Sequence, residues 1–264
     1  MSDKAKQRTA ADRIWDSILS KETCNPIREL IGESDIDAAY KIQQINTDRK
    51  LADGERIIGY KVGLTSFAVQ KQLGVDQPDF GVLTKSMLVN EDGEVPMSEL
   101  MQPKAEAEIA FFLSQDIDKK FISIYELIEF IDSVSASIEI VGSRIEAWNI
   151  RITDTIADNA SASHFVVGKS KVKLEDIDLV NCNMSMTKNG EVASVGQGSA
   201  CMGNPMNAAL WLVNTMVERG TILRKGDVIL SGALGPMVPV SLGDQFKAEI
   251  EGLGAVSVSF GNWP

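Results

Sequence analysis

Two glutamates, Glu106 and Glu108, stand two positions apart in the mostly apolar segment 103–111. Side chains two residues apart in a β-strand point to the same face, so a strand here would set the two carboxylates side by side. Carboxylates on an apolar strand repel each other and resist losing water, and a hard divalent cation relieves both costs. The pattern therefore indicates a site for Mg²⁺, Mn²⁺ or Ca²⁺, although an amphipathic strand with glutamates facing solvent has the same spacing.

A third glutamate, Glu139, lies inside another apolar, strand-like run, residues 135–141. It could complete a three-carboxylate site, or it could be an exposed strand residue. Mg²⁺ usually keeps several waters and recruits oxygens from a substrate. A 2-oxo acid offers a carboxylate and a carbonyl oxygen at chelating distance, so three carboxylates around one cation would suit such a ligand.

Two further side chains have types suited to proton transfer. Lys61 lies among glycines and apolar residues in the segment 57–64, where burial would lower its pKa. A surface lysine with a buried stem is the alternative. Asp79 follows a proline in a glycine-bounded loop and is either an acid/base group or a turn-stabilising aspartate.

The polar stretch 154–161 includes Asn159 and Ser161. It reads as irregular, and it either supplies hydrogen bonds to a substrate or is only a loop. His164, the single histidine, follows this stretch and is expected to be structural. Acid–base chemistry must therefore rest mainly on carboxylates, lysines, tyrosines or metal-bound water.

The elements that must position these residues fall into two groups. Residues 1–56 predict an N-terminal helical part, with helical apolar spacing in 10–20 and 36–45 and a capping box expected at Ser34. Residues 57–264 predict a β-rich, metal-dependent catalytic core, because their strands come in clusters and not in regular βα alternation. The expected fold class is α+β, with a mixed, mostly antiparallel core and helices outside.

Residue types typical of helix caps predict two helices within residues 57–264. Ser123 and Glu126 form a capping box. Asn204, Pro205 and Gly220 have the types preferred at the N-cap, the first helical position and the residue after the C-cap.

The formal net charge of −11 over 264 residues argues against nucleic-acid binding, because the chain would repel a phosphate backbone. No run reaches the roughly 18 apolar residues of a membrane helix, and the polar N-terminus lacks the apolar region of a signal peptide. The three cysteines are widely spaced, which argues against a disulfide framework and fits a cytoplasmic location.

Several separate motifs cover nearly the whole chain from about residue 55: GYKVGLT at 59–65, GVDQPDFG at 74–81, the segment 102–110, EIVGSRI at 139–145, the stretch 154–161, and SGALGPM at 231–237. Together they resemble those of the 2-oxopent-4-enoate (2-hydroxypentadienoate) hydratases, in the hydratase/decarboxylase branch of the fumarylacetoacetate hydrolase superfamily. The resemblance implies a β-roll catalytic core with an N-terminal helical part. It also implies a homo-oligomer, with a complex with the neighbouring pathway enzyme left open.

The resemblance further implies a cofactor, Mg²⁺ or Mn²⁺, and a set of site residues. These are the metal ligands Glu106, Glu108 and Glu139, the proton-transfer residues Lys61 and Asp79, and the substrate-binding residues Ser161 and Asn159.

The implied activity is hydration of 2-hydroxypenta-2,4-dienoate to 4-hydroxy-2-oxopentanoate in the meta-cleavage degradation of aromatic compounds. The 2-oxo-3-hexenedioate (4-oxalocrotonate) decarboxylases share the metal motif and are the alternative, although 198–205 and 231–237 look more hydratase-like. A non-catalytic partner subunit of a hydratase/decarboxylase complex is a second alternative. The presence of all three glutamates together with Lys61 and Asp79 speaks against it.

Overall fold

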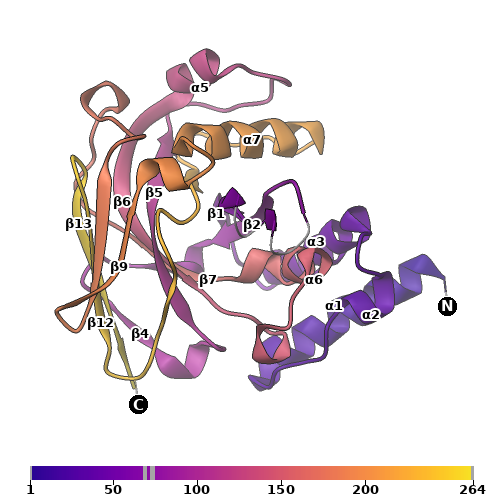
Figure 1. Ribbon diagram of the computed structural model, residues 1–264. Helices are drawn as coiled ribbons and strands as arrows, with labels where there is room; N and C mark the ends of the chain where they lie inside the picture. The colour runs from indigo at the N-terminus through magenta and orange to yellow at the C-terminus, as the bar shows by residue number, and fades with distance from the viewer. Residues whose placement is uncertain (1, 68–69, 72–74, 263–264) are drawn as a thin grey trace.

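The computed structural model describes residues 2–67, 70–71 and 75–262, and most of its helices lie to one side of two curled β-sheets (Figure 1). The helices are α1 (Asp3–Ser20), α2 (Arg28–Ile31), α3 (Ile36–Ala52), α5 (Ile124–Phe130), α6 (Ile152–Ala157) and α7 (Pro205–Glu218). Within the described ranges, no helix is both long and apolar enough to cross a membrane.

The strands form a larger and a smaller sheet. The larger sheet has the order β2 (Asp79–Thr84), β1 (Ile57–Gly63), β10 (Val228–Leu230), β5 (Lys104–Leu113), β6 (Ile131–Val141), β7 (Ala162–Val167) and β3 (Leu88–Val89), with β11 (Val238–Pro239) paired to β5. The smaller sheet has the order β4 (Glu94–Pro96), β13 (Gly254–Gly261), β12 (Gln245–Ile250), β8 (Asn183–Lys188) and β9 (Glu191–Gln197). Most pairs are antiparallel, while β1–β10, β3–β7 and β4–β13 are parallel. The prediction of an α+β fold with a mixed, mostly antiparallel core is confirmed.

The two sheets differ in how they are covered. Side chains of β12 alternate strictly between exposed and buried, as expected for a strand with one face in water. By contrast, β5 and β6 are buried on both faces over most of their length, with β12 and β13 packed against β6. A charged side chain on β5 or β6 is therefore surrounded by protein.

The predicted caps of α5 and α7 are confirmed. Ser123 and Glu126 exchange hydrogen bonds at the start of α5. At α7, Asn204 is the N-cap, Pro205 is the first helical residue, and Gly220 has a φ of 85° just after the C-cap.

Two local predictions are wrong. The side chain that caps α3 belongs to Asp35 and not to Ser34, because the Asp35 carboxylate accepts the backbone N–H of Ala38 at 2.9 Å. The stretch 154–161 is not irregular throughout, since its first residues continue the helix α6. Tertiary contacts stabilise that helix.

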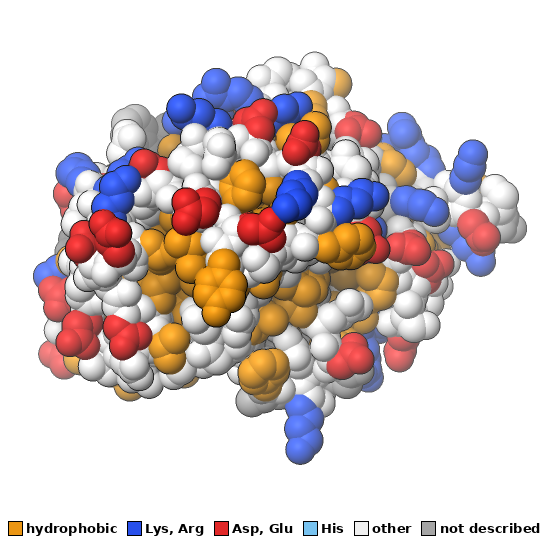
Figure 2. All heavy atoms as spheres, turned by 90° about the horizontal axis from the view of Figure 1, so that it is seen from above, with side chains coloured by type: hydrophobic (Ala, Val, Ile, Leu, Met, Phe, Trp, Pro, Cys, Tyr) orange, Lys and Arg blue, Asp and Glu red, His pale blue; other side chains and the backbone are white. Residues whose placement is uncertain are grey.

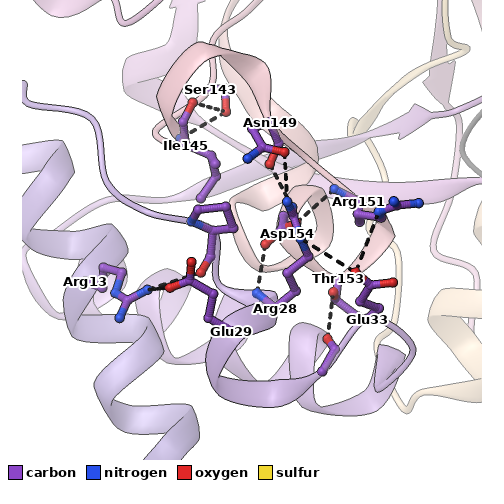
Figure 3. Close-up of polar contacts among 12 residues, drawn as sticks. Arg13, Arg28, Glu29, Glu33, Ser143, Ile145, Asn149, Arg151, Thr153 and Asp154 are labelled. Carbon is purple, nitrogen blue, oxygen red and sulfur yellow. Dashed lines mark hydrogen bonds and ion pairs between the residues drawn. The ribbon is translucent and has the colours of Figure 1, made fainter.

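Those contacts come from the N-terminal helices (Figure 3). Arg28 pairs with the buried carboxylate of Asp154, and its guanidinium also donates to Asn149 at 2.7 and 2.8 Å. Arg151 lies 3.8 Å from the carboxylate of Glu33. The N-terminal helices thereby fix α6, which leads directly into the turn at 159–161. The division into parts 1–56 and 57–264 stays a prediction, although α1 to α3 end before residue 56 and β1 begins at residue 57.

Candidate active site

The three glutamates singled out by their spacing lie together on the two central strands. In the register of β5 and β6, Glu106 is paired with Glu139, and Glu108 follows two residues along β5. One carboxylate oxygen from each lies within 4.8 Å of the others. Their relative exposures are 8% for Glu106 and 0% for Glu108 and Glu139, so neither solvent-facing alternative holds. Their role as ligands stays a prediction.

The environment of this glutamate triad does not satisfy its oxygens. Within the described residues, Oε1 of Glu108 and both carboxylate oxygens of Glu139 have no hydrogen-bond partner, while Oε2 of Glu108 accepts the backbone N–H of Gly232 at 2.9 Å. Burial raises the pKa of all three carboxyls, that of Glu139 to about 7. Buried carboxylate oxygens with this few donors suit a hard divalent cation, so the triad could hold a metal ion.

Lys61 of β1 supplies positive charge beside the triad. It is 3% exposed, its Nζ donates to the carbonyl of Ala160 at 2.9 Å, and it lies 3.3 Å from Oε2 of Glu139. Burial disfavours its charge, but the carboxylates around it, with Glu139 foremost, outweigh burial and raise the pKa of Lys61. The expectation of a lowered pKa is therefore wrong, and so is the surface-lysine alternative.

Asp79, the first residue of β2, lies beside Lys61 in the neighbouring strand. The antiparallel pairing of β1 and β2 sets Asp79 opposite Gly63. A Cβ added to Gly63 would lie 2.1 Å from Oδ1 of Asp79, so only glycine leaves room for this carboxyl. Asp79 is 1% exposed, and neither of its oxygens finds a hydrogen-bond partner in the ranges that the structure describes. Burial raises its pKa, with partial compensation from Lys61.

The two remaining predicted residues, Asn159 and Ser161, belong to one turn with Ala160 but line different cavities. All three residues have positive φ, at 54°, 49° and 57°. Ser161 is buried, and its hydroxyl has no hydrogen-bond partner among the described residues; it lines the same cavity as Lys61 and Asp79. The side chain of Asn159 instead bonds to the N–H and carbonyl of Val82 at 2.8 and 2.9 Å and lines a different cavity. The structure thus brings Ser161 to the site and leaves Asn159 outside it.

The cavity at this site, which we call the catalytic cavity, has a volume of about 420 Å³. Lys61, Asp79, Glu106 and Ser161 face it, and Lys61 is the only cationic side chain among the described residues that line it. The rest of the wall is mostly apolar: Val62, Leu64, Val141, Trp148, Ile150, Ala200, Ala233, Pro236 and Met237. A polar end and an apolar body are typical of small-molecule sites.

Sequence reasoning missed three contributors. Thr155 of α6 lines the cavity, and its hydroxyl lowers the pKa of Asp79 although the two groups do not meet the geometry of a hydrogen bond. Trp148 forms part of the apolar wall, and its indole N–H donates to the carbonyl of Gln102 at 3.0 Å. Gly232 donates to the triad through its backbone. Thr155 and Gly232 lie within segments that were singled out, 154–161 and 231–237, whereas Trp148 carries no signal of its own. His164 does not line the catalytic cavity and contacts Ser163 and Glu99; its purely structural role stays a prediction.

Comparison with known proteins agrees with this geometry. Residues 58–260 match the fumarylacetoacetate (FAA) hydrolase C-terminal family. A 2-keto-4-pentenoate hydratase of Paraburkholderia phymatum is 50% identical over 260 residues, which cover 98% of this chain and 99% of that protein. The TodF product hydratase of Pseudomonas putida is 49% identical over 253 residues, covering 96% and 94% of the two chains.

A solved structure matches over the same extent. The 4-oxalocrotonate decarboxylase from Pseudomonas putida G7, complexed with magnesium and adipate, has a TM-score of 0.93 and 33% identity over 98% of both chains. A second structure of that enzyme is complexed with calcium and acetate. By sequence and by fold, the chain belongs to the fumarylacetoacetate hydrolase C-terminal family.

Proposed function

We propose that this protein is a carbon–oxygen lyase that hydrates 2-hydroxypenta-2,4-dienoate (2-oxopent-4-enoate) to 4-hydroxy-2-oxopentanoate in the meta-cleavage degradation of aromatic compounds. One observation carries the proposal. A buried, partly unpaired carboxylate triad shares a site with Lys61 and Asp79, in a chain that is half identical to 2-keto-4-pentenoate hydratases along nearly its full length.

Glu106, Glu108 and Glu139 would hold Mg²⁺ or Mn²⁺, since both ions prefer oxygen ligands and leave positions for substrate oxygens. A bound divalent cation would neutralise charge on the substrate's carboxylate and 2-oxygen. The hydrogen bond from Gly232 to Glu108 fixes the direction in which one ligand points.

The reaction adds protons at two carbons, C5 and C3, and the oxygen of water at C4. The dienol loses its 2-hydroxyl proton and gains one at C5, which gives an enone. Water then adds its oxygen to C4 and loses a proton, and C3 takes up a proton, so one water is gained in total. Positioned acid–base groups typically contribute about 10²–10⁴-fold to such steps.

Lys61 and Asp79 are the residues placed to handle these protons. Lys61 stays charged because carboxylates surround it and raise its pKa. A charged lysine can donate a proton or a hydrogen bond to the substrate but cannot act as a base. Burial raises the pKa of Asp79, so this carboxyl can accept and return a proton near neutral pH more readily than an exposed aspartate. The free hydroxyl of Ser161 is available to orient water or the substrate.

The catalytic cavity favours a substrate with a single carboxylate. A dienoate places its charge at one end and a hydrocarbon chain at the other, which matches the distribution of charged and apolar residues in the wall. A 4-oxalocrotonate-type substrate would bring a second carboxylate into the apolar part, where no other cationic side chain among the described residues lines the wall. This observation favours hydration over decarboxylation.

We also propose a homo-oligomer. Figure 2 shows hydrophobic side chains gathered among charged ones on the face seen from above. The exposed large hydrophobic residues include Phe121 and Tyr125, at 73% and 80% exposure. Apolar patches of this kind mark interaction surfaces, for a second copy or for the neighbouring pathway enzyme. The three cysteines are free thiols, in keeping with a cytoplasmic location.

The test is an ultraviolet assay of the purified chain. Enzymatically generated 2-hydroxypenta-2,4-dienoate is followed with Mg²⁺, with Mn²⁺ and after exhaustive chelation, while carbon dioxide release from 2-oxo-3-hexenedioate is measured in parallel. We expect metal-dependent loss of the dienoate and little carbon dioxide, with Glu106→Gln inactive and the exposed Glu249→Gln fully active. Turnover by chelated protein would refute the metal role, dominant decarboxylation would favour the alternative enzyme, and no turnover would favour a non-catalytic subunit.

A further inference from the structure

A second cavity of about 260 Å³, which we call the helix-side cavity, lies between α1, α3 and the β-core. Its lining includes Asn159 and excludes Lys61, Asp79 and the glutamate triad. We propose that the helix-side cavity binds a small monocarboxylate with an apolar body, with the carboxylate against Lys50. This inference goes beyond the proposed hydration, which does not use the cavity.

Lys50 is the anchor of the proposed site. Lys50 and Thr47 are three positions apart on α3, so they lie on the same helix face, and both line the helix-side cavity. In the described part of the chain, neither side chain has a hydrogen bond or an ion pair to another residue. Burial first, and then the charge of Arg144, lower the pKa of Lys50 to about 8, against the opposing charges of Glu55 and Asp158. A half-buried cation that makes no ion pair within the described residues is unfavourable, and an anion bound against it would relieve that cost.

The other charges on the wall define how much negative charge the cavity accepts. Arg144 is paired with the buried carboxylate of Asp158, and Lys21 donates to the carbonyl of Glu99 at 3.1 Å. Because Glu99 and Asp158 themselves line the cavity, their charges offset those of Lys21 and Arg144. The described lining residues thus carry one more cation than anion, and Lys50 is the cation among them that makes neither an ion pair nor a hydrogen bond. A singly charged ligand balances it, whereas a doubly charged phosphate would meet two carboxylates.

The remaining wall suits a hydrocarbon body. Ile14 and Ile18 of α1 line the cavity together with the core residues Val82, Met87 and Met101. A volume of about 260 Å³ corresponds to roughly eight or nine waters at ~30 Å³ each. A ring or short chain with one carboxylate fits this space, with its charged end at Lys50 and its apolar end among these side chains.

The test uses 4-bromobenzoate, whose bromine can be located by anomalous diffraction. We expect a bromine peak in the helix-side cavity and saturable binding by calorimetry. Lys50→Gln should weaken binding at least about tenfold, because it removes a charge-assisted contact. Thr47→Val should weaken it about two- to tenfold through loss of one hydroxyl. Lys41→Gln, on the exposed side of the same helix, is the matched control and should bind as the wild type does.

Two comparison ligands sharpen the result. Neutral 4-bromobenzamide should not bind, and inorganic phosphate should bind much more weakly than 4-bromobenzoate. Bromine found only in the catalytic cavity, or unchanged affinity in correctly folded Lys50→Gln protein, would overturn the proposal. Phosphate binding that equals that of 4-bromobenzoate and depends on Lys50 would overturn the monocarboxylate assignment. None of these measurements needs turnover, so they stand or fall separately from the proposed hydratase activity.

Discussion

In the absence of divalent metal, the folding stability of this protein should fall as the pH rises from 4.5 to about 7, the unfolded and folded pKa values of Glu139. The cause is the glutamate triad, whose carboxyls have a higher pKa in the folded chain than in the unfolded chain. A carboxyl of this kind binds its proton more tightly when folded. It therefore favours the folded state at low pH, and this contribution is lost as the pH rises through the folded pKa.

The size of this loss in folding stability follows from the pKa shift of Glu139. Burial raises the pKa of its carboxyl from 4.5 to about 7, although the charge of Lys61 acts in the opposite direction. At ~1.4 kcal/mol for each tenfold change in proton affinity, Glu139 alone accounts for a loss of about 3 kcal/mol. Burial raises the pKa of Glu106 and Glu108 as well, so both act in the same direction. Domains of this kind have total stabilities of only about 5–15 kcal/mol.

The assay is urea unfolding followed by far-ultraviolet circular dichroism, in chelator, at several pH values, for the wild type and Glu139→Gln. The isosteric glutamine cannot titrate, so its stability should change by about 3 kcal/mol less over the same range. The difference between the two proteins removes the contribution of His164, whose lowered pKa acts in the opposite direction near pH 6 in both. Saturating Mg²⁺ should abolish the loss in the wild type.

One result would refute this reasoning. If the metal-free wild type and Glu139→Gln show the same pH dependence, the carboxyl of Glu139 is not held in a dry environment. The argument that the triad needs a cation would then fail as well.

Three further predictions concern single residues. Glu106→Gln should lower kcat with Mg²⁺ by at least about 10³-fold while the circular dichroism spectrum stays unchanged, and a variant that keeps wild-type kcat would contradict a role in metal binding. Gly63→Ala should lower kcat/KM by about 10²-fold, because the added methyl would lie 2.1 Å from Oδ1 of Asp79 and must displace it; unaltered steady-state kinetics would show that the position of Asp79 is not important. Arg28→Ala should lower the free energy of unfolding by about 3 kcal/mol, because it leaves the buried carboxylate of Asp154 without its cation; a loss below about 0.5 kcal/mol in urea unfolding would show that this contact does not hold α6 in place.

Spacing within one strand was enough to predict that Glu106 and Glu108 share a face. It was not enough to place Glu139 beside them, because that depends on the register between β5 and β6. The family motifs supplied the missing long-range information.

Lys61 shows why the electrostatics of the site could not be predicted from local sequence. Its chain neighbours are apolar, so a lowered pKa was expected, but the fold surrounds it with carboxylates from other strands. The same limit applies to α6. Its sequence is rich in threonine and aspartate, which have low helix propensity, and contacts from distant Arg28 stabilise the helix.

The turn at Asn159–Ser161 is a wall shared by two cavities, and its three positive φ values cost about 1 kcal/mol or more each. It persists because Asn159 is bonded to β2 on one side and the carbonyl of Ala160 accepts Lys61 on the other. A substitution that lets this turn relax toward the helices must also move the Ala160 carbonyl and the Ser161 hydroxyl. Among relatives of this chain, residues that line the catalytic cavity should therefore co-vary with residues that line the helix-side cavity.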